Sequence, residues 1–515
     1  MPKQKSVLIM VILFTLFVTS SVMAAPQYGG ELRFGLHRDP MGFEPHISQG
    51  ITNHSIQGNI YDTLIEYDEN GGFRGALAEN WEVLEDAVTY IFYLRQDVVF
   101  QDGKPFSAKD VIATFDRICD PDTNAAHYSE FIHLDYEAVD DYTVKVVVER
   151  PNATFLHMLA SHTAYIVSAD DIANGFNFLT DTNGTGPFIL TSWEPQGEYV
   201  LERSPTYWKE GLPYLDRVVQ MAIIDDGTRT NALRSGEVNL MEYVPWYELD
   251  LLELDFDVHL HYGAFNMIRI HLNQPPFDNK LVRQALNYVV DRQEILNLAY
   301  GGYGSVEDGP LQPEGSYFYY EELEQYYTKD HDKALSLLQE AGYDSPRDLP
   351  TIELNVAPIM VHSETAQIVQ EQLMSFGIPI QWKTVDTPAM VAARTSGTYM
   401  LQQDGLSMTW PDPDYLRHNF HSEGSGYARG VGFKNSRLDE VLEAGLASVD
   451  SEERRELYFE AEQIILDEAP WIFLFWRPQA EATHPSVQGY EIIPGGLGNF
   501  NVNRFEYIWI DESIL

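Results

Sequence analysis

Residues 78–111 read AENWEVLEDAVTYIFYLRQDVVFQDGKPFSAKDV, and this stretch decides the fold. Residues 89–94 are rich in β-branched and aromatic side chains, which predicts a strand. Asp102-Gly103 predicts a tight turn. Ser107, with Asp110 three residues later, is typical of the capped start of a helix. A strand, a turn and a capped helix in this order indicate a mixed α/β protein.

The second half of the chain carries the same mixture in another order. A strand is expected over residues 351–356, a helix over 363–376 and a further strand over 378–382, with Gly377 ending the helix. A strand–helix–strand order predicts a parallel pair covered by its helix. Asp278 and Ser451 are expected to cap two further amphipathic helices.

The first 25 residues are typical of a secretory signal. Lys3 and Lys5 precede an apolar run over residues 7–18, and small residues lead to Ala24 and Ala25. A membrane-spanning helix needs roughly 20 apolar residues, so this run is too short for a permanent anchor. No cysteine follows it, which excludes a lipoprotein. We therefore expect cleavage near Ala25 and a periplasmic protein.

Charge and cysteine content exclude several classes of protein. The chain has 33 Lys and Arg against 78 Asp and Glu, a net charge of −45. Such a field repels nucleic acid, and it suits either a salty habitat or a cationic ligand. Cys119 is the only cysteine, so no intramolecular disulfide and no cysteine-based metal site can form.

Six further short motifs follow residues 78–111 in a fixed order. They are GTGPF (184–188), YW (207–208), GLPYLD (211–216), ALRSGEVN (232–239), PFDNKLVRQAL (276–286) and PDPD (411–414). Together these motifs resemble the extracellular solute-binding proteins of family 5, the dipeptide, oligopeptide and nickel binders of ABC importers. The resemblance runs from about residue 30 to the C-terminal region.

The resemblance implies a two-lobed periplasmic binding protein of the α/β class with an extra β-rich accessory domain. The ligand would lie between lobes that close by hinge motion. The partners would be the permease subunits of an ABC importer, and the protein would be a monomer without cofactor or enzymatic activity. The implied divisions are a signal peptide (1–25), lobe I (26–63, 184–268 and 485–515), the accessory domain (64–183) and lobe II (269–484).

The resemblance also implies where the ligand binds, and here the sequence departs from the dipeptide binders. Those relatives place an Asp just before the equivalent of Trp410, where this chain has Met408 and Thr409. They also carry an Arg ahead of the helix that corresponds to residues 365–376, where this chain has His362-Ser363-Glu364. The candidate ligand-binding residues are Trp410, Thr409, Met408, Asp412, Asp414, Trp246, Tyr247 and His46, with Asp404 as another acid able to replace the missing one.

Several functions remain open at this stage. A peptide-like ligand is expected, with an oligosaccharide or an opine as the alternative. The pairs His259/His261 and His418/His421 lack a third ligand at useful spacing, so a metal-complex binder is a minor alternative and no metal site is expected. No nucleophile elbow or His-Glu-x-x-His helix supports a hydrolase. A ligand-sensing receptor would share the same sequence features.

Overall fold

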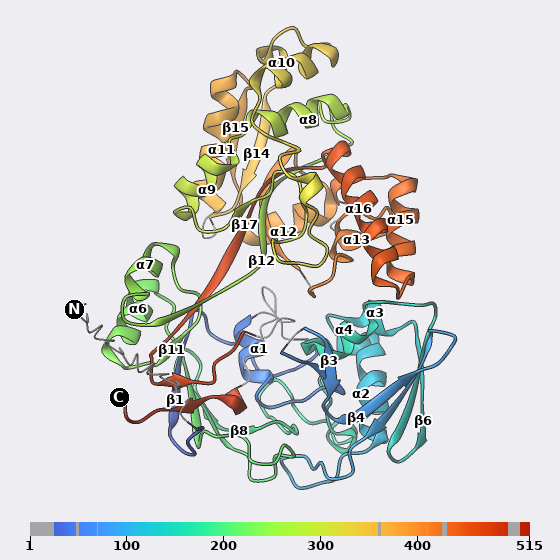
Figure 1. Cartoon of the computed structure of the whole chain (residues 1–515), viewed down its shortest axis with the longest axis vertical. Coiled ribbons are helices and arrows are strands. Elements are labelled where there is room, and N and C mark those ends of the chain that lie inside the picture. The colour runs from blue at the N-terminus through green and yellow to red at the C-terminus, as the bar shows by residue number, and fades with distance from the viewer. Residues whose placement is uncertain are drawn as a thin grey trace, which may run out of the picture.

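The computed structural model describes residues 25–47, 51–69, 71–358, 362–408, 410–424, 430–492 and 505–514. Figure 1 shows an upper and a wider lower body, connected by two long strands. The predicted signal peptide lies outside the described residues, apart from Ala25. Among the helices of the described ranges, none is long and apolar enough to cross a membrane.

One sheet of 11 strands runs through both bodies. Its longest strands, β12 (Asp257–Ile270) and β17 (Trp471–Thr483), pair antiparallel along almost their whole length. The pairing shifts after Tyr262 and again after Asn266, and such bulges bend a strand and increase its twist. Because both strands pass from the upper to the lower body, the two bodies are joined by a paired ribbon suited to hinge motion (Figure 1).

The other strands of the sheet lie on either side of this ribbon. Next to β12 are β16 (Leu401–Ser407), β14 (Ile352–Val356) and β15 (Ile380–Thr384), and β13 (Ser305–Val306) pairs with β17. On the other side follow β11 (Leu240–Met241), β1 (Glu31–Leu36), β10 (Arg217–Ala222), β9 (Glu198–Arg203) and β8 (Phe188–Trp193). Strands β14 and β15 are parallel and are joined through α11 (His362–Phe376), which confirms the predicted strand–helix–strand unit.

A separate four-stranded sheet forms the accessory domain. Its order is β4 (Ala78–Val83), β5 (Thr89–Leu94), β7 (Thr143–Val148) and β6 (Leu134–Asp140). The predicted turn is present, with Gly103 at φ 83° and a bridge that closes it between Val99 and Pro105. Helix α2 (Ala108–Cys119) begins with the predicted capping box, in which the Ser107 backbone N–H donates to Asp110 at 2.9 Å.

The remaining helices and short strands complete the two bodies. In the lower body they are α1 (Ile51–Gln57), β2 (Ile65–Tyr67), β3 (Phe73–Gly75), α3 (Tyr128–Phe131), α4 (Phe155–Ala160), α5 (Ala169–Ala173), α6 (Asp226–Ser235), α7 (Leu249–Leu252), β18 (Val487–Gln488) and β19 (Trp509–Ile510). In the upper body they are α8 (Lys280–Val289), α9 (Arg292–Tyr300), α10 (His331–Glu340), α12 (Thr387–Ser396), α13 (Tyr415–Phe420), α15 (Ser436–Ala447) and α16 (Ser451–Glu468).

Two of the predicted helix caps are wrong by one residue. Helix α8 is capped by Asn279, whose side chain accepts from the N–H of Leu281, and Asp278 lies outside. Helix α16 is capped by Asp450 instead of Ser451. In both places neighbouring residues are good caps, and the backbone conformation selects the one that is extended.

The GTGPF motif is explained by close packing of two backbones. A Cβ atom on Gly184 would lie 1.9 Å from the carbonyl oxygen of Ile60, and one on Gly186 would lie 2.7 Å from the same carbonyl group's carbon. Ile60 accepts from the Gly186 N–H at 2.9 Å. Any side chain at Gly184 would push these segments apart, so the glycine is required where the accessory domain returns to the first lobe.

The upper body touches the accessory domain directly. Trp410 is only 3% exposed and packs within the hydrophobic cluster of the accessory domain, with residues such as Tyr67 and Phe155. The N–H of Ala153 donates to the carbonyl of Leu446 at 2.9 Å, and Arg150 forms an ion pair with Glu443. The two bodies therefore contact each other directly, in addition to being joined by β12 and β17.

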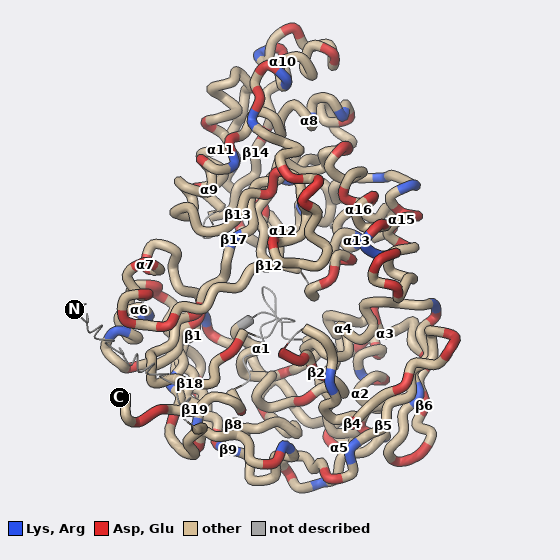
Figure 2. The backbone as a smooth tube through the Cα atoms, viewed as in Figure 1, with Lys and Arg blue, Asp and Glu red and all other residues tan. Residues whose placement is uncertain are grey.

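Acidic side chains outnumber basic ones over both bodies. Figure 2 shows Asp and Glu along the helices of the upper body and on the loops of the lower one. Many of the 33 basic residues form ion pairs with nearby acids, among them Lys280 with Asp467 and Arg437 with Glu460. Any arginine left without a carboxylate is therefore conspicuous against this background.

Candidate functional site

Polar side chains gather where the two bodies meet along β12 and β17. On β17, Arg477 and Gln479 point to the same face, since alternate residues of a strand do so. In the register, His261 of β12 is opposite Gln479 and Ala264 is opposite Arg477. His261 is 4% exposed, and neither of its ring nitrogens has a hydrogen-bond partner. Nη1 of Arg477 is likewise buried without a partner.

The upper body contributes Asn266 and His362 to this junction. A Cβ atom on Gly405 would lie 2.8 Å from Nε2 of His362 and 2.9 Å from Oδ1 of Asn266, so both side chains approach the backbone of β16 at this glycine. Asn266 is fully buried, yet neither its amide oxygen nor its nitrogen is hydrogen-bonded, and Nδ1 of His362 also lacks a partner. Buried polar groups are normally satisfied, so this cluster is expected to meet water or ligand.

The lower body contributes Tyr243, just after β11. Tyr243 has φ 57°, the left-handed region that costs a non-glycine residue about 1–3 kcal/mol. Its hydroxyl accepts from Nε2 of Gln479 at 3.1 Å, and His37 stacks on its ring at 4.4 Å. Nδ1 of His37 lies 2.6 Å from Oε1 of the buried Glu242. The strained backbone thus aims the phenol ring at β17.

Neutral imidazoles characterise this junction. Burial, and then the positive charge of Arg477, lowers the pKa of His261 to about 4. Burial also lowers the pKa of His362 to about 4, although the nearby Asp404 opposes the shift. At neutral pH, Arg477 is therefore the positive charge that faces both rings.

The predicted Asp residues are all engaged by arginines. Asp412 forms a bidentate ion pair with Arg454, in which Nη1 donates to Oδ2 at 2.9 Å and Nη2 donates to Oδ1 at 2.8 Å. Asp414 accepts from Arg417 at 3.0 Å. A ligand ammonium group at either acid would have to compete with a guanidinium group.

Asp404, the other acid considered as a replacement, lies between two arginines. Oδ2 accepts from Nε of Arg269 at 2.6 Å, and Oδ1 accepts from Arg394 and from the N–H of Gly405. Asp404 and Arg269 are completely buried. This acid therefore links β16 to β12 and to α12 within the upper body.

The predicted loop residues have different environments. Met408 is buried in the core of the upper body, and its N–H donates to the carbonyl of Gly263 at 2.9 Å. Thr409 lies outside the described residues. Trp410 enters the accessory-domain cluster, and its indole N–H has no partner.

The predicted aromatic pair lies at the edge of the junction. Trp246 packs against hydrophobic clusters of both bodies and lies 6.3 Å from the ring of Tyr300, which is beside Arg477. Tyr247 meets Trp246 edge-to-face at 5.7 Å but is 54% exposed. Of the two, Trp246 is the one close to the buried polar cluster.

His46 lies in the framework between the first lobe and α2. Its Nε2 donates to the carbonyl of Tyr165 at 2.8 Å, so Nδ1 accepts from Arg117 at 2.6 Å. Burial, and then Arg117, lowers the pKa of His46 to about 3. Arg117 is also paired with Glu44. This arrangement requires a neutral imidazole.

The buried His46 should make folding stability depend on pH. An unfolded histidine titrates near pH 6.5, so between pH 6.5 and about 3 the unfolded chain binds a proton that the folded chain does not. Stability is therefore lost as the pH falls below 6.5. The variant His46→Gln is expected to flatten this slope by up to about 1.4 kcal/mol per pH unit.

Thermal unfolding at pH 7, 6 and 5 measures the difference between the variant and the unmodified protein. His133→Gln is the control, because His133 is an exposed residue with a side-chain exposure of 63%. Equal slopes for His46→Gln and the unmodified protein would mean that His46 does not resist protonation.

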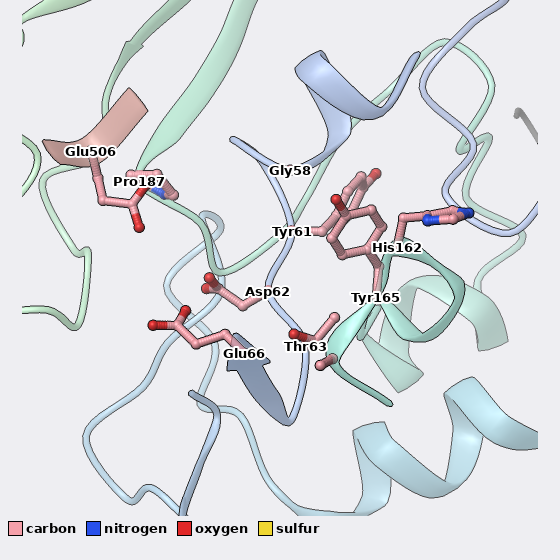
Figure 3. A pocket seen from close by; sticks show the side chains of 10 residues that line it. Gly58, Tyr61, Asp62, Thr63, Glu66, His162, Tyr165, Pro187 and Glu506 are labelled. Carbon is pink, nitrogen blue, oxygen red and sulfur yellow. The ribbon is translucent and has the colours of Figure 1, made fainter. Parts of the chain in front are cut away.

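A small cavity of about 40 Å³ lies in the lower body, lined by Asp62, Glu66, His162, Tyr165 and Glu506 among others (Figure 3). Oδ2 of Asp62 accepts from Trp208 at 2.9 Å, and burial raises the pKa of Asp62 to about 6. The volume suits one or a few water molecules and excludes a peptide or a sugar. This cavity is therefore a different kind of site from the polar cluster at the junction of β12 and β17.

Sequence reasoning missed Arg477, Asn266 and Tyr243. Residues 477–483 read RPQAEAT, in which polar residues alternate with small or apolar ones, and this alternation is the signal of a strand with one polar face. From the sequence, His259 and His261 indicate only a minor metal-binding alternative, whereas His261 belongs to the buried polar cluster. Within the described residues, no group of three or more His, Cys, Asp or Glu side chains is arranged to hold a metal ion.

Comparison with known proteins gives consistent matches. The family described as bacterial extracellular solute-binding proteins, family 5 middle, matches residues 72–428. The glutathione-binding protein GsiB of Pectobacterium atrosepticum is 27% identical over 94% of this chain and 96% of its own length.

Two solved structures share the fold over nearly the whole chain. The binding protein AgaA of A. tumefaciens R10, in complex with agropinic acid, is 28% identical with a TM-score of 0.80, over 94% of this chain and 99% of AgaA. The periplasmic protein DppA of Helicobacter pylori, in complex with the peptide STSA, is 25% identical with a TM-score of 0.81, over 94% of this chain and 99% of DppA.

Proposed function

The chain belongs to the bacterial extracellular solute-binding proteins of family 5, and from this premise we propose that its solute is a small peptide-like molecule. The protein is a substrate-binding protein that works with the permease subunits of an ABC importer. The ligand would be enclosed between the two lobes at the junction of β12 and β17. An opine is the second candidate, because a relative of similar identity is bound to agropinic acid.

The observation that carries this proposal is the set of buried polar atoms without partners at the junction. Both ring nitrogens of His261, both amide atoms of Asn266 and Nη1 of Arg477 are in this state. In a closed arrangement they would be satisfied by a bound polar solute. Trp246 and Trp410 are proposed to border the ligand, as the sequence analysis expects.

We further propose that the protein releases its ligand unchanged. The family and the similar proteins are binding proteins, and the junction combines Arg, His, Asn and Gln side chains without an evident nucleophile. Recovery of unaltered ligand by mass spectrometry after prolonged incubation supports a binding role. A transformed product would contradict it.

The place of action is proposed to be the periplasm, reached through cleavage near Ala25. The expected mature chain begins at Pro26. N-terminal sequencing of protein released by osmotic shock from the host bacterium tests this directly. The domain ranges given in the sequence analysis are proposed to hold for the mature protein.

A thermal-shift screen tests the ligand class. The mature chain, freed of carried-over ligand by unfolding and refolding, is heated with glutathione, short peptides, agropinic acid and neutral oligosaccharides. A ligand at 100 times its Kd should stabilise the fold by about 2.7 kcal/mol. Shifts with glutathione or peptides support the proposal. A rise in melting temperature with oligosaccharides alone contradicts the proposal. A rise with agropinic acid alone supports the opine as the ligand.

A further inference from the structure

We propose that Arg477 binds a carboxylate group of the ligand, so that the protein selects anionic solutes. The inference rests on the proposed function and adds the chemistry that the site recognises. Arg477 lies on β17 at the crossing between the lobes, half-buried. Among the described residues, no carboxylate lies within ion-pair distance of its guanidinium group, and Nη1 is buried without a hydrogen bond.

Arg292 differs from Arg477 because its guanidinium group has several hydrogen-bond acceptors. Arg292 is buried and forms no ion pair within the described ranges, but it donates to the backbone carbonyls of Phe473 and Tyr327 at 2.8 and 2.6 Å, and to others. Its charge is thus fully solvated by the protein. Arg477 lies near the phenols of Tyr243 and Tyr300, and its Nη1 has no hydrogen-bond partner. A guanidinium group in this position has unused donors that suit a carboxylate.

The groups that face Arg477 favour an anion. From β12 comes His261 and from α11 comes His362, both neutral at pH 7 and both with a ring nitrogen free to donate or accept. Asp404, the acid of the upper body that acts on His362, is held by two arginines of its own. In the lower body, Glu242 is paired with His37. Arg477 therefore places a positive charge beside two neutral imidazoles.

Arg477 also accounts for a departure noted in the sequence. The dipeptide binders that the chain resembles carry an arginine just ahead of the helix that corresponds to α11, and this chain has His362 there. Arg477, on β17, interacts electrostatically with His362 at the start of α11. The positive charge is therefore restored from a different element, about 115 residues later in the chain.

Two variants and a set of paired ligands test the proposal. Arg477→Met removes the positive charge and keeps a side chain of similar length. Arg477→Lys keeps the charge but cannot bind a carboxylate in bidentate geometry. The ligands are glutathione, Ala-Ala-Ala and agropinic acid, each compared with its carboxamide derivative, with maltotriose as a neutral solute. Binding is measured by calorimetry at pH 7.5. Arg437→Met, at an exposed ion pair on α15, is the matched control.

The expected result has three parts. The unmodified protein and Arg437→Met bind at least one of the acids, and its carboxamide binds about 30-fold or more weakly. Arg477→Met loses the preference between acid and carboxamide, and Arg477→Lys retains part of it. The melting temperature of ligand-free Arg477→Met does not fall, because no ion pair is broken in the unliganded protein.

The outcomes separate the inference from the proposed function. If Arg477→Met binds an acid as tightly as the unmodified protein, the inference is wrong and the binding role stands. Tighter binding of carboxamides or of maltotriose by the unmodified protein also overturns the inference. If the unmodified protein binds none of these ligands, the proposed ligand class fails, and the inference fails with it.

Discussion

Replacement of Asp404 by alanine is expected to lower the free energy of unfolding by about 3–5 kcal/mol. Asp404 is completely buried on β16, and it is the shared partner of Arg269 and Arg394. Removing the carboxylate leaves two buried guanidinium groups facing a cavity. An uncompensated buried charge costs far more than the ion pair itself contributes, so the loss should be large.

Urea denaturation followed by circular dichroism measures this loss. Asp467→Ala is the matched control, because Asp467 pairs with Lys280 and the two side chains are 51% and 39% exposed. That variant should lose less than about 1 kcal/mol. Similar midpoints for Asp404→Ala and Asp467→Ala would show that the buried pair does not hold the upper body together.

Replacement of Trp410 by alanine is expected to weaken ligand binding by roughly 10- to 100-fold. The indole ring projects from the upper body into the accessory domain. It is buried only while the upper body and the accessory domain are in contact. Burying a large apolar side chain contributes about 1.5–3 kcal/mol, and this contribution favours the closed arrangement that holds the ligand. Without it, a larger part of the binding energy is needed for closure.

Calorimetry with the ligand identified in the thermal-shift screen measures the change in affinity. The melting temperature of the ligand-free protein is measured as well, and it should change little if the lobes are open without ligand. Trp193→Ala is the control, since Trp193 lies on β8 of the first lobe and is 38% exposed. Unchanged affinity together with a large fall in the ligand-free melting temperature would assign Trp410 to a permanent core.

Local patterns predicted the elements of the fold well. The strand at 89–94, the turn at Gly103, the capping box at Ser107 and the unit of β14, α11 and β15 are each encoded within a few residues. The caps at Asn279 and Asp450 were missed by one residue because two adjacent side chains could serve. Such choices depend on backbone conformation rather than on composition.

The candidate site was less accessible to sequence reasoning because it is made by distant residues. Gln479 and Tyr243 are 236 positions apart, and no local pattern marks them as partners. Residues 471–476 are conspicuous as an apolar run, but the strand continues through Arg477 to Thr483. The junction depends on the pairing of β12 with β17, which only the tertiary structure provides.

The central claim is that the two lobes close around a solute at the junction of β12 and β17. Small-angle X-ray scattering from the mature protein, without ligand and with saturating ligand, tests it most directly. The radius of gyration is expected to decrease when ligand is added, and the liganded curve is expected to match the structure in which Trp410 is buried in the accessory domain. Identical curves at a ligand concentration that calorimetry shows to be saturating would contradict closure as the mode of capture.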